Sequence, residues 1–122
     1  MTRILVIDDD AQIRSILKEM LEGAGYDVIE APDGEIGLKL FRENPFDLII
    51  MDIVMPKKDG IDVIAELQHD FPDVKVIAIS GGGFLKKEDY LQKADELGAV
   101  RSLSKPFRTK KLLKTVKELL LK

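Results

Sequence analysis

The chain has 122 residues, 45% hydrophobic and 34% charged, which predicts one domain over 1–122. It contains no cysteine and one histidine, which excludes disulfides, thiolate chemistry and zinc sites built on several histidines. The net charge of −3 disfavours nucleic acid as a partner, and no apolar run nears the about 20 residues that cross a membrane, so we expect a cytoplasmic location without membrane insertion.

The first part of the chain is predicted to alternate strands with helices. A strand over 4–7 runs into Asp8, Asp9 and Asp10, and Asp10 is the expected N-cap of the helix that follows. A short second strand over 26–31 precedes a second helix that stops before a proline. The side chains expected to face the core are Ile13, Ile16, Leu17, Met20 and Leu21 in the first helix, and Ile36, Leu40 and Phe41 in the second.

The stretch over 47–60 is predicted to be the centre of the domain. Leu48–Met51 is a continuous apolar run, typical of a strand buried on both faces of a sheet. Asp52 follows directly, and a turn at Pro56 and Asp59–Gly60 precedes a third helix. The carboxylate of Asp52 is therefore expected at the carboxyl edge of the sheet, where open α/β sheets bind ligands.

Two further strands complete the predicted fold. One over 75–79 ends in Ser80, and one near 100–103 ends in Ser104-Lys105-Pro106; a helix from about 86 to 97 lies between them, and a last helix begins at Thr109. Alternation of five strands with five helices predicts an α/β fold, a doubly wound five-stranded parallel sheet with helices on both faces. The flavodoxin-like strand order 2-1-3-4-5 is the form of this class that we expect.

Three carboxylates, of Asp8, Asp9 and Asp52, are thus predicted to meet at one sheet edge. At ~4 Å each like-charged pair costs about 1–4 kcal/mol, so a cation is expected among them. All-oxygen ligands suit a hard divalent ion such as Mg²⁺. The simpler alternative is that these aspartates are solvated loop residues.

The acidic pair, the strand-end Asp52, the hydroxyl of Ser80 and Lys105-Pro106 together resemble the receiver domain of two-component response regulators, over essentially the whole chain. The resemblance implies that Asp52 accepts a phosphoryl group, with Ser80 and Lys105 contacting it. It implies Mg²⁺ bound by Asp9, Asp52 and the carbonyl of Val54, with Asp8 helping through water. Read singly, Ser80 would be interpreted as a turn residue, Lys105 as a solvated strand end and Pro106 as a loop stop; it is their combination that favours the site. The family implies a signalling switch that assists its own phosphorylation and slow dephosphorylation, rather than an enzyme.

Two positions depart from the family pattern. Ser102 stands where receivers usually carry an aromatic switch residue, so we predict that activation centres on the glycine loop 81–83 and the helix after it. Val54 and Gly82 stand at the positions that influence hydrolysis, and neither has a side chain able to orient water. A positioning contribution typically worth ~10²-fold is then missing, which predicts a long-lived phosphoform.

Charge is distributed unevenly along the chain. Residues 1–83 carry 8 basic and 17 acidic groups, whereas 84–122 carry 11 basic and 5 acidic groups. The surface from Lys86 to Lys122 is either a solvated face or a docking site for an acidic downstream protein. The resemblance adds a sensor histidine kinase or histidine phosphotransfer protein as partner. His69 is interpreted as a surface residue at a helix end.

Two other classes remain open. A haloacid dehalogenase-type phosphatase would use the D-x-D of 8–10 with Asp8 as nucleophile, but Gln12 stands where that family expects Thr or Val. An FMN-binding flavodoxin shares the fold, yet its phosphate loop is rich in Ser, Thr and Gly. Because the chain ends with the last predicted helix, we expect a stand-alone receiver, although a piece of a longer regulator would have the same sequence.

Overall fold

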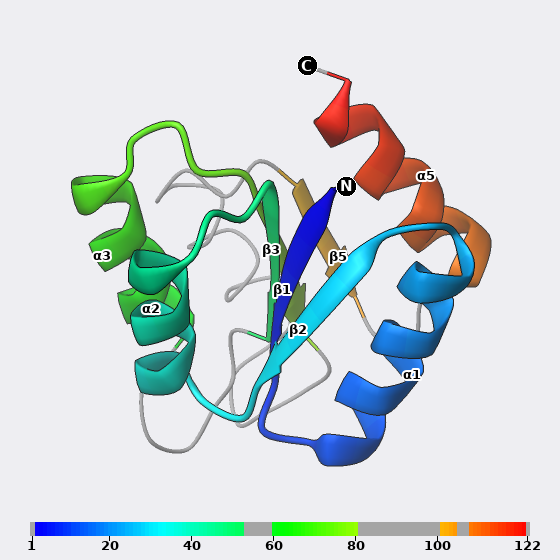
Figure 1. The fold of residues 1–122 in the computed structure, drawn as a ribbon, viewed down its shortest axis with the longest axis horizontal. Coiled ribbons are helices and arrows are strands. Elements are labelled where there is room, and N and C mark those ends of the chain that lie inside the picture. Colours follow the sequence, from blue (N-terminus) through cyan, green and yellow to red (C-terminus); the bar gives the residue numbers. More distant parts are fainter. Residues whose placement is uncertain (1, 53–59, 81–100, 105–107, 122) are drawn as a thin grey trace.

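The computed structural model describes residues 2–52, 60–80, 101–104 and 108–121, built around a parallel sheet (Figure 1). Its strands are β1 (Arg3–Ile7), β2 (Asp27–Ala31), β3 (Leu48–Asp52), β4 (Val76–Ser80) and β5 (Arg101–Ser104). They lie in the order β2-β1-β3-β4-β5, and every neighbouring pair is parallel. The parallel α/β sheet predicted from the alternation of elements is therefore confirmed, with β3 at its centre.

Helices cover both faces of the sheet. They are α1 (Ala11–Gly23), α2 (Gly34–Glu43), α3 (Gly60–Asp70) and α5 (Thr109–Leu120). Figure 1 shows α2 and α3 on one face and α1 and α5 on the other. The helix predicted over about 86–97 lies outside the described residues. Among the helices that the structure describes, none combines the length and apolarity needed to cross a membrane.

Two hydrophobic cores follow from the alternation of side chains along the strands. In β1, Leu5 and Ile7 belong to the core under α2 and α3, whereas Ile4 and Val6 belong to the core under α1 and α5. All five residues of β3 are buried, as expected for a strand covered on both faces. At about 1.5–3 kcal/mol for each large apolar side chain removed from water, these central strands anchor the positions of the residues that follow them.

The orientation of α2 differs from the prediction. Ile36 was expected to face the core but is 42% exposed, while Gly37 and Leu38 are buried in its place. The cause is a close approach: a Cβ at position 37 would clash with Cδ1 of Ile7 on β1. The helix therefore lies with its glycine against the sheet, and Leu40 and Phe41 pack at the margin of the core.

The prediction for α1 was also wrong at one position. Leu17 and Leu21 are buried and Ile13 and Met20 are partly buried, but Ile16 is 45% exposed. Five apolar residues cover a wider arc of the helix than the sheet can contact, so the outermost one remains in solvent.

Candidate functional site

The described part of the candidate site begins at the carboxyl ends of two neighbouring strands. β1 pairs with β3 so that Ile7 lies opposite Met51. The next residues, Asp8 and Asp52, are therefore brought side by side at the same edge of the sheet. This is the edge at which open α/β sheets bind their ligands.

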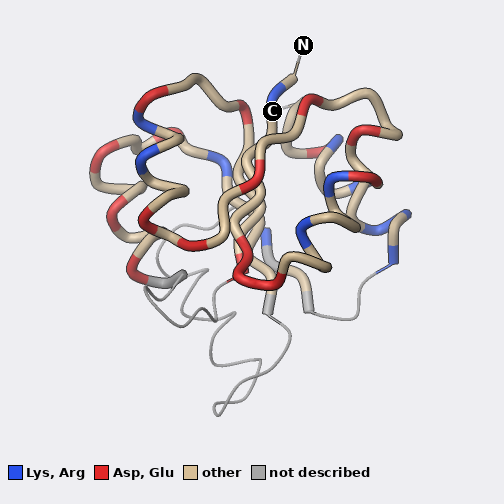
Figure 2. The backbone as a smooth tube through the Cα atoms, turned by 60° about the horizontal axis from the view of Figure 1, so that its bottom comes forward, with Lys and Arg blue, Asp and Glu red and all other residues tan. Residues whose placement is uncertain are grey.

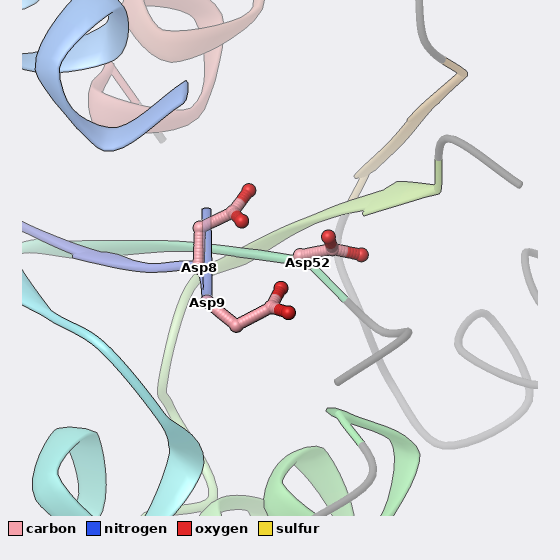
Figure 3. Close-up of side chains that lie close together, drawn as sticks. All are labelled: Asp8, Asp9 and Asp52. Atoms are coloured by element: carbon pink, nitrogen blue, oxygen red, sulfur yellow. The ribbon is translucent and has the colours of Figure 1, made fainter. Parts of the chain in front are cut away.

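Asp9 joins these two residues to form a cluster of three carboxylates (Figure 3). One carboxylate oxygen from each of Asp8, Asp9 and Asp52 lies within 4.8 Å of the others. Asp8 is 1% and Asp52 is 7% exposed, whereas Asp9 is exposed to solvent. Two buried carboxylates beside an open third form an all-oxygen donor set that fits a hard divalent cation with some of its water retained.

The main chain holds the first carboxylate in place. The Asp10 N–H donates to Oδ1 of Asp8 at 2.9 Å, and the Asp8 N–H donates to the carbonyl of Ala31 at 3.2 Å. Hydrogen bonds from N–H groups to a carboxylate stabilise its charged form and restrict its rotation. The turn after β1 therefore presents Asp8 in a defined orientation.

Asp10 fixes the other end of this turn, as the sequence predicted. Its Oδ1 accepts hydrogen bonds from the N–H groups of Gln12 at 2.9 Å and Ile13 at 3.4 Å, so that it caps α1. A side-chain cap of this type typically stabilises a helix by about 1 kcal/mol. The acidic run thus divides into a capping residue and two residues that face the cluster.

Arg14 contacts this turn, although the sequence pattern does not single it out. Its Nη1 donates to the carbonyl oxygen of Asp8 at 2.6 Å, and its Nε lies 3.5 Å from Oε1 of Glu30 on β2. Because an arginine in the first turns of a helix is common, its residue type did not indicate a role at the site. The one available signal was its spacing from the acidic run, which places it over the N-terminal turn of α1.

The remaining predicted site residues are only partly covered. Ser80 ends β4, which is the neighbour of β3, and pairs in register with Ser104 at the end of β5. The order of strands therefore brings these two strand ends to the edge that carries the carboxylates. Val54 and Lys105 lie outside the described residues.

A second charged group lies between α2 and α3. Nη2 of Arg42 contacts Oε1 of Glu66 at 3.1 Å and Oδ2 of Asp70 at 2.8 Å, and Nδ1 of His69 lies 3.1 Å from Oδ1 of Asp70. The hydrogen bonds to His69 and then Arg42 lower the pKa of Asp70 from its ordinary value of 3.8. The pKa of Arg42 is raised by its bonds to Asp70 and Glu66. His69 is exposed at a helix end, as predicted from the sequence.

Comparison with known proteins identifies the family to which this geometry corresponds. The model of the response regulator receiver domain matches residues 4–117. The chain is 38% identical over 120 residues to the transcriptional regulatory protein CpxR of Escherichia coli, covering 98% of this chain and 50% of CpxR. It is also 38% identical over 117 residues to the protein CcdB of Bacillus subtilis, covering 95% of each. The chain thus spans about half the length of the transcriptional regulator.

A solved structure agrees with these relatives. The response regulator protein TrrA from Thermotoga maritima, in complex with Mg²⁺-BeF, superposes with a TM-score of 0.87 at 34% identity. The match covers 98% of this chain and 99% of that one. The likeness therefore extends over nearly the whole of both chains.

Proposed function

Because this chain belongs to the response regulator receiver domain family of two-component systems, we propose that it is a phosphorylation switch that accepts a phosphoryl group on Asp52. One observation carries the assignment. Asp52 ends the buried central strand, and one carboxylate oxygen from each of Asp52, Asp8 and Asp9 lies within 4.8 Å of the others. Family members are in general signalling phosphoacceptors rather than classical enzymes. The phosphoryl donor would be a sensor histidine kinase or a histidine phosphotransfer protein.

The proposed transfer uses Asp52 as a nucleophile. One of its carboxylate oxygens attacks the phosphorus of a phosphohistidine, the P–O bond forms as the P–N bond breaks, and the imidazole leaves. Lys105 and Ser80 are proposed to contact the phosphoryl oxygens. This placement is supported by the position of Ser80 at the end of the strand beside β3.

Receiver domains bind Mg²⁺ in an acidic pocket, and the donor set here fits that ion. Asp9, Asp52 and the carbonyl of Val54 would hold it directly, with Asp8 acting through water. When bound, Mg²⁺ would neutralise charge on the transferring phosphoryl group, which is most of what a protein can contribute to this reaction. The TrrA complex with Mg²⁺-BeF supports this proposal by likeness.

The proposed output surface lies over β5 and α5; the predicted helix over about 86–97 belongs to the same prediction but lies outside the described residues. A hollow of about 560 Å³ is lined there mainly by basic side chains, and Figure 2 shows basic positions recurring along α5. Its lining residues are Arg101, Leu103, Lys110, Lys111, Lys114, Thr115 and Glu118. The basic lining supports an acidic downstream protein as partner of the surface Lys86–Lys122.

The test is the intact mass of the protein after treatment with acetyl phosphate and Mg²⁺. Wild type should gain one phosphoryl group, and Asp52→Asn should gain none. The exposed Asp62 on α3 provides a matched control, since Asp62→Asn removes a carboxylate that does not belong to the cluster and should leave the adduct unchanged. An adduct that persists in Asp52→Asn but is lost in Asp8→Asn would instead favour a phosphatase of the haloacid dehalogenase type.

The lifetime of the phosphoform is a second readout of the same proposal. Without a polar side chain at 54 or 82 to orient water, hydrolysis should be slow for a receiver, and Val54→Asn should accelerate it. The measurement is loss of phosphate from purified protein at neutral pH. Decay within seconds in wild type, or an unchanged rate in Val54→Asn, would contradict the predicted long life.

A further inference from the structure

Arg14 joins the helix after the acidic turn to the peptide that carries two of the cluster's carboxylates. Nη1 donates to the Asp8 carbonyl at 2.6 Å, and the N–H of the same arginine donates to the Asp10 carbonyl at 3.0 Å. The side chain is only 16% exposed. A charge-assisted hydrogen bond that is largely shielded from water is stronger than an ordinary surface contact.

Glu30 supports the arginine from the neighbouring strand. It lies opposite Val6 in the pairing of β1 with β2, and its Oε1 is 3.5 Å from Nε of Arg14. Its second oxygen is 3.9 Å from Nζ of Lys18, one helical turn further along α1. The guanidinium is thus held between a strand carboxylate and a main-chain carbonyl, a geometry that its planar fork can satisfy and an ammonium cannot.

The carbonyl that Arg14 contacts belongs to the peptide between Asp8 and Asp9. Because a peptide unit is planar, holding its oxygen restricts rotation of the whole plane, and with it the range of ψ of Asp8 and φ of Asp9. Those two angles determine where both side chains leave the main chain. One hydrogen bond therefore restricts the main chain from which two of the three carboxylates extend.

We propose that Arg14, supported by Glu30, is a positioning residue that holds Asp8 and Asp9 in the orientation that binds the divalent cation. The proposal rests on the proposed function, since it concerns the same cluster. According to this proposal, part of the affinity for the cation depends on an arginine that lies outside the cluster. Sequence comparison alone would attribute all of that affinity to the aspartates.

Positioning and simple charge predict changes of opposite sign. Arg14 is a cation near a cation site, so by Coulomb's law its removal should strengthen Mg²⁺ binding. Loss of positioning should weaken binding, and groups that orient metal ligands typically contribute about 10–100-fold to affinity. The direction of the change therefore separates the two effects.

The experiment measures Mg²⁺ affinity by isothermal titration calorimetry on the folded, unphosphorylated chain. Arg14→Ala should weaken binding by about 10-fold or more. Arg14→Lys keeps the charge but loses the fork, so it should weaken binding to a smaller extent. Lys18→Ala is the matched control, because it removes the same charge from the same helix and from the same partner, Glu30, without touching Asp8. Its Mg²⁺ affinity should be unchanged or slightly higher.

The outcomes distinguish this inference from the proposed function. Arg14→Ala and Arg14→Lys that bind Mg²⁺ as tightly as wild type would overturn the inference and leave the function intact. If wild type binds no Mg²⁺, the proposed function fails and the inference fails with it. Should Arg14→Ala not fold, Arg14→Lys decides: it should weaken binding while Lys18→Ala does not, and an Arg14→Lys affinity equal to that of wild type overturns the proposal.

Discussion

Two groups of charged side chains in this domain are built on opposite principles. The cluster of Asp8, Asp9 and Asp52 gathers three charges of one sign at the sheet edge, two of them buried. The α2–α3 network gathers Arg42 between Glu66 and Asp70, opposite charges in contact on the surface. The first brings like charges together, and the second brings opposite charges together.

The difference shows which group is organised for a ligand. In the α2–α3 network the opposite charges neutralise each other without a ligand, and water and salt screen their attraction. Like charges brought within a few ångströms repel one another, and an added cation relieves that repulsion. The cluster should therefore respond strongly to Mg²⁺, whereas the network should respond only to salt and pH.

The largest expected effect is stabilisation of the fold by Mg²⁺ through the cluster. At a concentration of 100 times the dissociation constant, a ligand that binds only the native state stabilises by about 2.7 kcal/mol. Urea unfolding with and without Mg²⁺ should show this increase in wild type. It should be lost in Asp52→Asn and retained in Arg42→Ala; an equal response in both variants would contradict the comparison.

The second effect concerns the cluster without metal. In EDTA, Asp52→Asn should be more stable than wild type, because it removes like-charge repulsion that costs about 1 kcal/mol or more at ~4 Å. The measurement is the free energy of unfolding by urea, with Asp62→Asn as control. A destabilised Asp52→Asn would mean that groups around this carboxylate already compensate its charge.

A smaller effect is expected from the network. Arg42→Ala should lower the urea midpoint slightly at low salt, and the difference from wild type should shrink as NaCl is added, because these side chains are exposed. The matched variant is Lys39→Ala, which removes a charge from the same helix and for which the structure describes no ion pair. If stability depended on salt equally in the two variants, the network would make no specific contribution to stability.

The smallest expected effect is a dependence of the stability of the fold on pH, confined to acidic pH. The pKa of Asp70 is lowered in the folded chain by His69 and then Arg42, so its contribution is present above the ordinary value of 3.8. That contribution is lost as the pH falls from there through the lowered value. Urea midpoints measured on both sides of pH 3.8 should fall less steeply in Asp70→Asn than in wild type. If the urea midpoints of the two proteins fell in parallel with pH, the pKa of Asp70 would be the same in the folded and unfolded states.

The strands and the cluster could be predicted from the sequence because both depend on short-range patterns, whereas the strand order was expected from the fold class. The apolar runs 4–7 and 48–51 are each followed directly by an aspartate, and a parallel sheet brings the carboxyl ends of its strands to one edge. That argument needs only the period of the side chains and the direction of the strands. The cap by Asp10 was predictable for the same reason, since capping is local.

The features that sequence reasoning missed depend on contacts between distant residues. Ile36 has helical spacing suited to the core, but the rotation of α2 is set by Gly37 against Ile7, which no local pattern reveals. Arg14 acts on a main-chain carbonyl, and main-chain partners leave no trace in residue types. The roles of Val54, Ser80 and Lys105 remain predictions.

The contact between α2 and β1 has a consequence for how this sequence can vary. Position 37 has no room for a methyl group because Cδ1 of Ile7 occupies that space, so the two positions share one fixed volume. Gly37→Ala alone should force Ile7 into another rotamer, directly before the acidic turn. Relatives with alanine at 37 should then carry a smaller side chain at 7. Covariation between these two positions would thus record the distance between helix and sheet.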